Sequence, residues 1–184
     1  MGKVVGYDIS NEQIAKAKQE NVETTKAQFI VSSPADFNFD GVFDKAVSIV
    51  VLPYARGIEE LQTFFENTFR HLKGSGSFVS IIFNPDYRRF GQTAYNRRFS
   101  KDGSQIKVEF IDPKNVTTFS AHFSDFKKVD YERCAREAGF NNVEWKNLTI
   151  EEEGKRAMGE EFWIAYEEDC HYIALVVTKS EGVH

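Results

Sequence analysis

An acidic residue ends the first apolar segment of the sequence, and its position gives it two possible roles. Val4 to Asp8 is a short run of strand-forming residues, and Ser10 and Gln13 have the spacing of a helix-capping box. In nucleotide-binding α/β proteins, a carboxylate at such a strand end accepts hydrogen bonds from ribose hydroxyls. It can instead stabilise the N-terminus of the following helix by about 0.5 kcal/mol. Asp8 is therefore a candidate ribose ligand.

Three of the 4 histidines are candidate general bases, because imidazole exchanges a proton near neutral pH. His71 stands near the end of a predicted helix beside Lys73, where we expect it to complement the helix dipole at the surface. His171 precedes a predicted strand, and we expect a structural role for it. His122 lies in an aromatic-rich segment that could cover a substrate, and it is our candidate catalytic base.

Two arginine pairs, Arg88–Arg89 and Arg97–Arg98, stand among aromatic residues. This pattern suits an anionic substrate, or nucleic-acid bases stacked on aromatic rings. The formal net charge is -5, and acidic residues also occur in the same segment, so we expect no nucleic-acid partner. The pattern favours a solvated cap over a pocket for a small molecule.

Strands and helices alternate along the first half of the sequence. A nearly continuous apolar run at residues 44–52 is typical of a central parallel strand. Alternation predicts βαβ units and an α/β fold with a mostly parallel sheet. Residues 84–125 interrupt it and predict a loop or short helix followed by a two-stranded hairpin. The last predicted strand, residues 172–178, is expected to be antiparallel.

Periodicity and glycine predict the remaining elements. A helix from Ile58 is expected to close at Gly74, and the next strand to begin at Phe78. A helix before Gly139 and another over residues 151–168 are also predicted. We expect one domain, residues 1–184, with the insertion at about residues 84–125 as a substrate cap.

Composition excludes several classes of protein. Of the 184 residues, 41% are hydrophobic and 28% charged, as in a globular domain. The 2 cysteines lack the spacing of a disulfide framework or zinc cluster, so no metal site is expected. No segment has the length of a membrane span, and the start lacks the layout of a signal peptide. We therefore expect a cytoplasmic protein with no membrane partner.

Four segments, taken in order, resemble one enzyme family. They are VVGYDIS, FDKAVSIVVLPYA, HLKGSGSFVSIIF and REAGFNNVEW. Together they resemble the class I S-adenosylmethionine-dependent methyltransferases of the small-molecule type, and the resemblance covers nearly the whole chain. It implies a Rossmann-like three-layer sandwich with a mostly parallel sheet and an antiparallel C-terminal strand. It also implies S-adenosylmethionine as the cofactor.

The resemblance further implies which residues contact that cofactor. Asp8 holds the place of the acid that binds both ribose hydroxyls, and Ile9 that of a residue lying over the cofactor. The segment that meets the adenine in the family is represented here by Ser33, Pro34 and Asp36.

A second strand end completes the implied site. Ser48 and Ile49 end the strand that, in the family, runs along the methionine part of the cofactor and faces the substrate. The resemblance thus predicts transfer of a methyl group to a small-molecule acceptor.

The family's glycine-rich turn is absent from the sequence. Family members carry a strand ending in GxGxG ahead of the ribose-binding acid, whereas only Gly2 and Gly6 precede Asp8 here. The glycines of that turn let the backbone approach the cofactor. We therefore expect the first strand of the fold to be missing, and cofactor binding and methyl transfer to be impaired or absent in this chain.

Three accounts of this departure are open. The chain is a truncated form of a longer protein, which is the simplest account, or a remnant that closed the gap by pairing its second strand with its fourth. In the third account a partner chain supplies the strand, which would make a homodimer by strand pairing or exchange.

Two other functions also remain open. The first is a non-catalytic, methyltransferase-derived binding or interaction domain. The second is a nicotinamide-dependent oxidoreductase, because an acid after a second strand also binds ribose in those enzymes.

Overall fold

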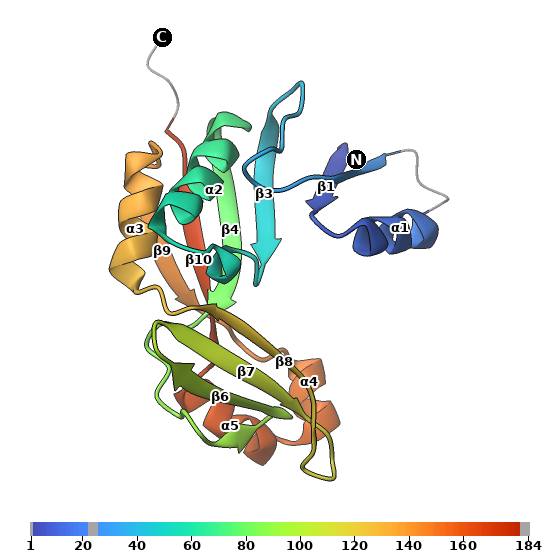
Figure 1. The fold of residues 1–184 in the computed structure, drawn as a ribbon, viewed down its shortest axis with the longest axis vertical. Helices are drawn as coiled ribbons and strands as arrows, with labels where there is room; N and C mark the ends of the chain where they lie inside the picture. The colour runs from blue at the N-terminus through green and yellow to red at the C-terminus, as the bar shows by residue number, and fades with distance from the viewer. Residues whose placement is uncertain (1, 22–25, 181–184) are drawn as a thin grey trace. The chain divides into compact units, whose positions relative to one another are not determined.

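A computed structural model describes residues 2–21 and 26–180 (Figure 1). The chain divides into two compact units, Met1–Gly41 and Val42–His184. The first unit holds β1 (Val4–Asp8), α1 (Asn11–Glu20) and β2 (Ala27–Val31). β1 and β2 are parallel, so the unit is the predicted βαβ arrangement.

Helix α1 begins where the capping residues predict. The Ser10 side chain accepts a hydrogen bond from the Gln13 amide at 3.2 Å, which satisfies one of the helix's free amides. Ile14 is buried, whereas most of the other α1 residues are exposed. One apolar contact face and a capped start therefore suffice to place α1 against its small sheet.

The second unit is built on a four-stranded sheet with the order β3-β4-β10-β9. β3 (Phe43–Ile49) and β4 (Leu72–Phe83) are parallel. β10 (Tyr172–Thr178) lies between β4 and β9 (Asn142–Asn147) and is antiparallel to both. The prediction that the last strand is antiparallel is therefore confirmed.

One face of this sheet carries the main core, against α2 (Ile58–Arg70) and α3 (Lys128–Glu137). Phe65 of α2 is fully buried and makes edge-to-face contacts with the rings of Phe78 and Phe140. The helix, the sheet and the segment after α3 are thus held by one aromatic contact group.

The end of α2 differs from the prediction. The helix ends at Arg70 with His71 as its C-cap, and Gly74 lies inside β4 instead of closing the helix. Leu72 is buried in the main core, which draws the chain into the sheet earlier than the glycine suggests. The register of β4 against β3 then shifts near Phe43, and Ser75 in this stretch has a φ of 61°.

Residues 93–124 form a four-stranded antiparallel sheet instead of the predicted two-stranded hairpin. Its strands are β5 (Thr93–Ala94), β6 (Arg97–Asp102), β7 (Gln105–Ile111) and β8 (Thr117–Ser124). Tyr95 and Asn96 both have positive φ and form the two-residue turn between β5 and β6. Neither residue is a glycine, so the sequence did not indicate this turn.

The inner face of the β5–β8 sheet packs on a separate aromatic core. Phe83, at the end of β4, contacts the rings of Tyr87, Phe99 and Phe123. Ile106 and Val108 complete the buried group. This second core joins the β5–β8 sheet to the carboxyl end of β4.

The Glu-rich segment forms two helices where one was predicted. α4 (Glu152–Met158) and α5 (Glu160–Glu168) meet at Gly159, whose φ of 82° interrupts the helix. The α/β fold class is otherwise as predicted. Among the helices that the structure describes, none is long and apolar enough to cross a membrane.

Gly139 ends α3 and allows a stability prediction. The Gly139 amide donates a hydrogen bond to the Arg136 carbonyl, and the Phe140 amide donates one to the Ala135 carbonyl, as in a Schellman motif. The φ of Gly139 is +108°, and an added Cβ would lie 2.8 Å from Phe69 Cζ. We expect Gly139→Ala to lower the free energy of unfolding by about 2–3 kcal/mol in urea denaturation.

Gly159 provides the matched control for this change. Its φ is +82°, but an added Cβ would meet nothing within 4 Å. Gly159→Ala should therefore cost only the backbone strain, about 1 kcal/mol. Equal costs at the two glycines would contradict the steric argument at Phe69.

Candidate functional site

In the first unit, the carboxylate of Asp8 stands at the carboxyl end of β1. Its Oδ1 accepts a hydrogen bond from the Ser10 amide at 2.8 Å. Among the described residues, Oδ2 has no hydrogen-bond partner, and the side chain is exposed. The next residue, Ile9, is 74% exposed. An oriented carboxylate beside an exposed apolar side chain suits a ribose with an attached ring.

The turn after β2 lies at the same edge of the small sheet. Asp8 and Val31 are paired in register, and the Ser32 amide donates to the Asp8 carbonyl at 3.0 Å. Ser33 Oγ donates to Asp36 Oδ2 at 2.5 Å and accepts from the Asp36 amide at 3.1 Å. These contacts, with Pro34 inside the turn, fix its shape.

The structure therefore brings the predicted ribose and adenine contacts of this unit to one edge. Phe37 follows the turn and stacks on Tyr7 of β1, with ring centres 4.2 Å apart. The stack ties the turn to the strand that carries Asp8. Partial burial against Phe37 raises the pKa of the Tyr7 hydroxyl above its ordinary value.

Ser48 and Ile49 lie at the carboxyl end of β3 in the second unit. Ser48 Oγ is 2.7 Å from Ser80 Oγ, so its hydroxyl is engaged within the sheet. Ile49 is 67% exposed. Of the two, Ile49 is the side chain open to a ligand.

Val50 is a feature of this strand end that the sequence reasoning missed. Its φ is 54°, a left-handed conformation that β-branched residues rarely adopt. Its amide donates to the Ile81 carbonyl at 2.7 Å, which holds the chain in place as it leaves the sheet. Strain of this kind concentrates at functional sites. Nothing in the local sequence distinguishes Val50 from Val51.

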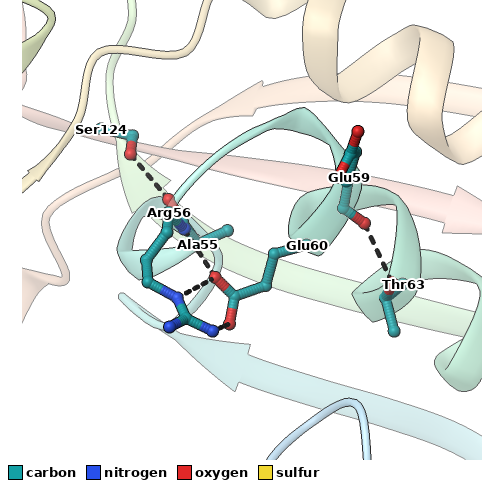
Figure 2. A network of polar contacts seen from close by, with 6 residues as sticks. All are labelled: Ala55, Arg56, Glu59, Glu60, Thr63 and Ser124. Atoms are coloured by element: carbon teal, nitrogen blue, oxygen red, sulfur yellow. Dashed lines mark hydrogen bonds and ion pairs between the residues drawn. The ribbon is translucent and has the colours of Figure 1, made fainter.

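The β5–β8 sheet is fastened close to the same strand end (Figure 2). Ser124 Oγ, at the end of β8, donates to the Ala55 carbonyl at 2.6 Å. Ala55 follows the short helix η1 (Leu52–Tyr54), which itself follows β3. Arg56 and Glu60 clamp the start of α2 through an Nε–Oε2 contact of 3.0 Å.

His122, the candidate base, lies on the outer face of the β5–β8 sheet. Neighbouring residues of a strand point to opposite faces, and Phe123 is buried in the aromatic core. His122 Nε2 is 3.4 Å from Asp102 Oδ2, and its side chain is 40% exposed. A carboxylate partner orients the imidazole, but the ring lies on the face opposite the aromatic core. Its role as a base stays a prediction.

The other two histidines are both buried. His71 is 7% exposed, not at the surface as predicted, and its Nδ1 lies 2.8 Å from the Asn67 carbonyl oxygen. His171 is 4% exposed, and its ring contacts those of Phe99 and Tyr172. Burial, with a smaller contribution from the positive charge of Arg97, lowers the pKa of His171 to about 4. His171 is therefore neutral at physiological pH.

This buried histidine predicts a pH dependence of stability. In the unfolded chain, His171 binds a proton below its ordinary pKa of 6.5. In the folded protein it binds that proton only near pH 4. The contribution of His171 to stability therefore falls as the pH drops through that window. In His171→Phe we expect a shallower loss of the free energy of unfolding between these pH values, measured by urea denaturation. Parallel losses in variant and parent would contradict the assignment.

The chain is similar to known proteins both in sequence and in structure. Residues 1–80 match the sequence model of a family described as "Methyltransferase domain". An amino pentose methyltransferase from Micromonospora echinaspora is similar in structure, with a TM-score of 0.70 and 14% identity over 97% of this chain and 74% of its own. A sugar N-methyltransferase from Streptoalloteichus has a TM-score of 0.65 and 20% identity over 96% of this chain and 71% of its own.

A third solved structure points the same way. An S-adenosylmethionine-dependent methyltransferase from Clostridium acetobutylicum has a TM-score of 0.67 and 13% identity over 97% of this chain and 75% of its own. Among curated proteins, none matches this chain. The chain has the class I methyltransferase fold, and the resemblance drawn from the four sequence segments is confirmed.

Proposed function

We propose that the chain binds S-adenosylmethionine and belongs to the enzymes that transfer its methyl group to a small molecule. The observation that carries this proposal is the methyltransferase-family match over residues 1–80, which includes the β1 end where Asp8 and Ile9 are open to a ligand. The solved relatives named for sugar substrates support a small-molecule acceptor.

The residues at the edge of the β1–β2 sheet fit the nucleoside part of that cofactor. Asp8 Oδ2 can accept hydrogen bonds from the ribose hydroxyls, while the Ser10 amide holds Oδ1. Ile9 offers an apolar surface for the adenine, and the Ser33–Asp36 turn borders it. The bound cofactor would supply a methyl group activated by its positively charged sulfur.

The second unit would position the acceptor. By the resemblance, Ser48 and Ile49 stand at the family's methionine-side positions, and in this proposal residues 84–125 act as the cap that excludes water from the acceptor. His122 remains the candidate base for acceptors that must lose a proton. The single-domain organisation and the cytoplasmic location are further predictions of the same proposal.

We further propose that the 184 residues bind the cofactor weakly. These 184 residues contain no GxGxG ahead of Asp8, so they do not themselves include the backbone amides that such a turn would offer the methionine carboxylate. Asp8 and its neighbours would then provide most of the affinity.

Thermal melting with two ligands tests the class of enzyme. S-adenosylhomocysteine at about 10 mM should raise the melting temperature, because a ligand that binds only the folded state stabilises it. NADH at the same concentration should raise it less. A rise with NADH alone would favour an oxidoreductase, and no rise with either would favour a non-catalytic domain. Micromolar affinity for S-adenosylhomocysteine in calorimetry would contradict the proposed weak binding.

A further inference from the structure

Arg97 is a positively charged group with an unused donor. Its guanidinium carbon lies 5.3 Å from the centre of the Phe110 ring and 6.0 Å from that of Tyr172. Its Nε is buried and has no hydrogen-bond partner among the described residues. A buried donor without an acceptor is costly, and a charged one more so. The terminal Nη groups are not among these buried unpaired atoms, so they are the donors that a bound anion can reach.

Two other arginines of the same segment, Arg89 and Arg98, are neutralised within the chain. Arg89 contacts Glu168 at 2.8 Å, and Arg98 contacts Glu109 at 3.0 Å. No carboxylate lies within ion-pair distance of Arg97 in the part of the chain that the structure describes. Of the two arginines in the second pair, Arg97 is therefore the one left to meet an external anion.

The position of Arg97 is that of a ligand-binding residue. It pairs with Phe110 across β6 and β7, on the same face as buried Phe99. Tyr172 pairs with Phe83, the last residue of β4. The guanidinium thus lies beside the carboxyl end of a central strand, where α/β sheets bind their ligands.

The turn before Arg97 is held rigidly. Tyr95 has a φ of 52°, its hydroxyl donates to the Phe162 carbonyl at 3.0 Å, and its ring stacks on Trp163. The Ile111 amide donates to the Asn96 carbonyl at 2.8 Å. A residue that follows such a fixed turn is positioned before any ligand arrives.

The charge around Arg97 selects the kind of anion. The charge of Arg97 contributes to the lowered pKa of His171, and the His171 ring is neutral at physiological pH. Lys101, on the same face of β6, is paired with Asp125 at 2.7 Å. One uncompensated positive charge matches a carboxylate better than a phosphate dianion, and the two terminal Nη groups of arginine can donate to the two carboxylate oxygens.

We propose that Arg97 binds a carboxylate group of the methyl acceptor, with the rings of Phe110 and Tyr172 against the body of that molecule. The acceptor's role rests on the proposed function, whereas the binding of a carboxylate at Arg97 does not. The inference narrows the substrate class to small carboxylic acids.

An NMR titration of the parent chain with sodium benzoate tests the site. Benzoate should shift the Nε–Hε signal of Arg97 in a saturable way at millimolar concentration, whereas neutral benzamide should not. Phenyl phosphate should bind more weakly than benzoate. The proposal is wrong if benzoate and benzamide act alike, if the shift does not saturate, or if phenyl phosphate binds more tightly.

Two variants locate the binding. Arg97→Met keeps a long apolar side chain over Phe110 and should abolish the saturable benzoate shifts of nearby amides. Arg98→Met, on the opposite face of the same strand, should leave them unchanged; equal losses in both variants would overturn the assignment. The NMR shifts that S-adenosylhomocysteine causes at Asp8 test the proposed function separately. If benzoate binds at Arg97 but S-adenosylhomocysteine causes no shifts at Asp8, the carboxylate site is supported and its assignment to a methyl acceptor is wrong.

Discussion

Phe65→Ala is expected to lower the free energy of unfolding by about 3–5 kcal/mol. The ring is fully buried in α2 and contacts Phe78 of β4 and Phe140 beyond α3. Its removal leaves a cavity at the point where three elements meet, and the contacts that it loses cannot be replaced by water. Urea denaturation of parent and variant, followed by circular dichroism, measures the difference.

Phe119 is the matched control for this substitution. It is 60% exposed on β8 and contacts only the Phe110 ring among the described aromatic pairs. Phe119→Ala should therefore cost less than about 1 kcal/mol. Similar losses for the two variants would mean that the main core is not centred on Phe65.

Asp8→Ala is expected to weaken binding of S-adenosylhomocysteine by about 10- to 100-fold. A hydrogen bond to a charged group contributes about 1.5–3 kcal/mol, and this carboxylate is the predicted acceptor for the ribose hydroxyls. The substitution also removes the hydrogen bond that the Ser10 amide donates to Asp8 Oδ1. Amide NMR titrations give the dissociation constant of the parent and at least a lower limit for that of the variant.

Asp40→Ala removes the same charge from the same unit and serves as the control. Asp40 is exposed and lies apart from the β1 strand end in sequence. Its replacement should leave the dissociation constant within about twofold, because an exposed charge contributes little and Asp40 makes no hydrogen bond with Asp8, Ser10 or the Ser33–Asp36 turn in the part of the chain that the structure describes. An unchanged constant in Asp8→Ala, or equal changes in both variants, would remove Asp8 from the cofactor site.

Strands that are apolar and regular were predictable from the sequence. β1 and β10 have the predicted bounds, because VVGYD and YIALVVT are runs of strand-forming residues between polar segments. The antiparallel direction of β10 was also predicted. The strand end at Asp8 and the turn at Ser33 were likewise located from the resemblance to the family.

Other features depend on contacts between distant residues and were not predictable. Gly74 has the residue type of a helix cap, yet burial of Leu72 draws the chain into β4. The Tyr95–Asn96 turn is held by Trp163 and the Phe162 carbonyl, far along the chain. In such cases tertiary packing overrides local preference.

At the candidate site, too, some features were predictable from the sequence and others were not. The sequence placed Arg97 and Arg98 together as one pair, but only the structure separates the neutralised Arg98 from Arg97 with its unused donor. Alternation along a strand would have placed His122 and Phe123 on opposite faces, but which face is buried depends on Phe83 at the end of another strand.

The most direct test of the account is where S-adenosylhomocysteine binds. In an amide NMR titration of the parent chain, the account predicts saturable shifts concentrated at Asp8–Ser10 and at Ser33–Phe37, with a millimolar dissociation constant, and much smaller shifts with NADH. Shifts centred elsewhere, or NADH shifts at these residues without any from S-adenosylhomocysteine, would contradict it.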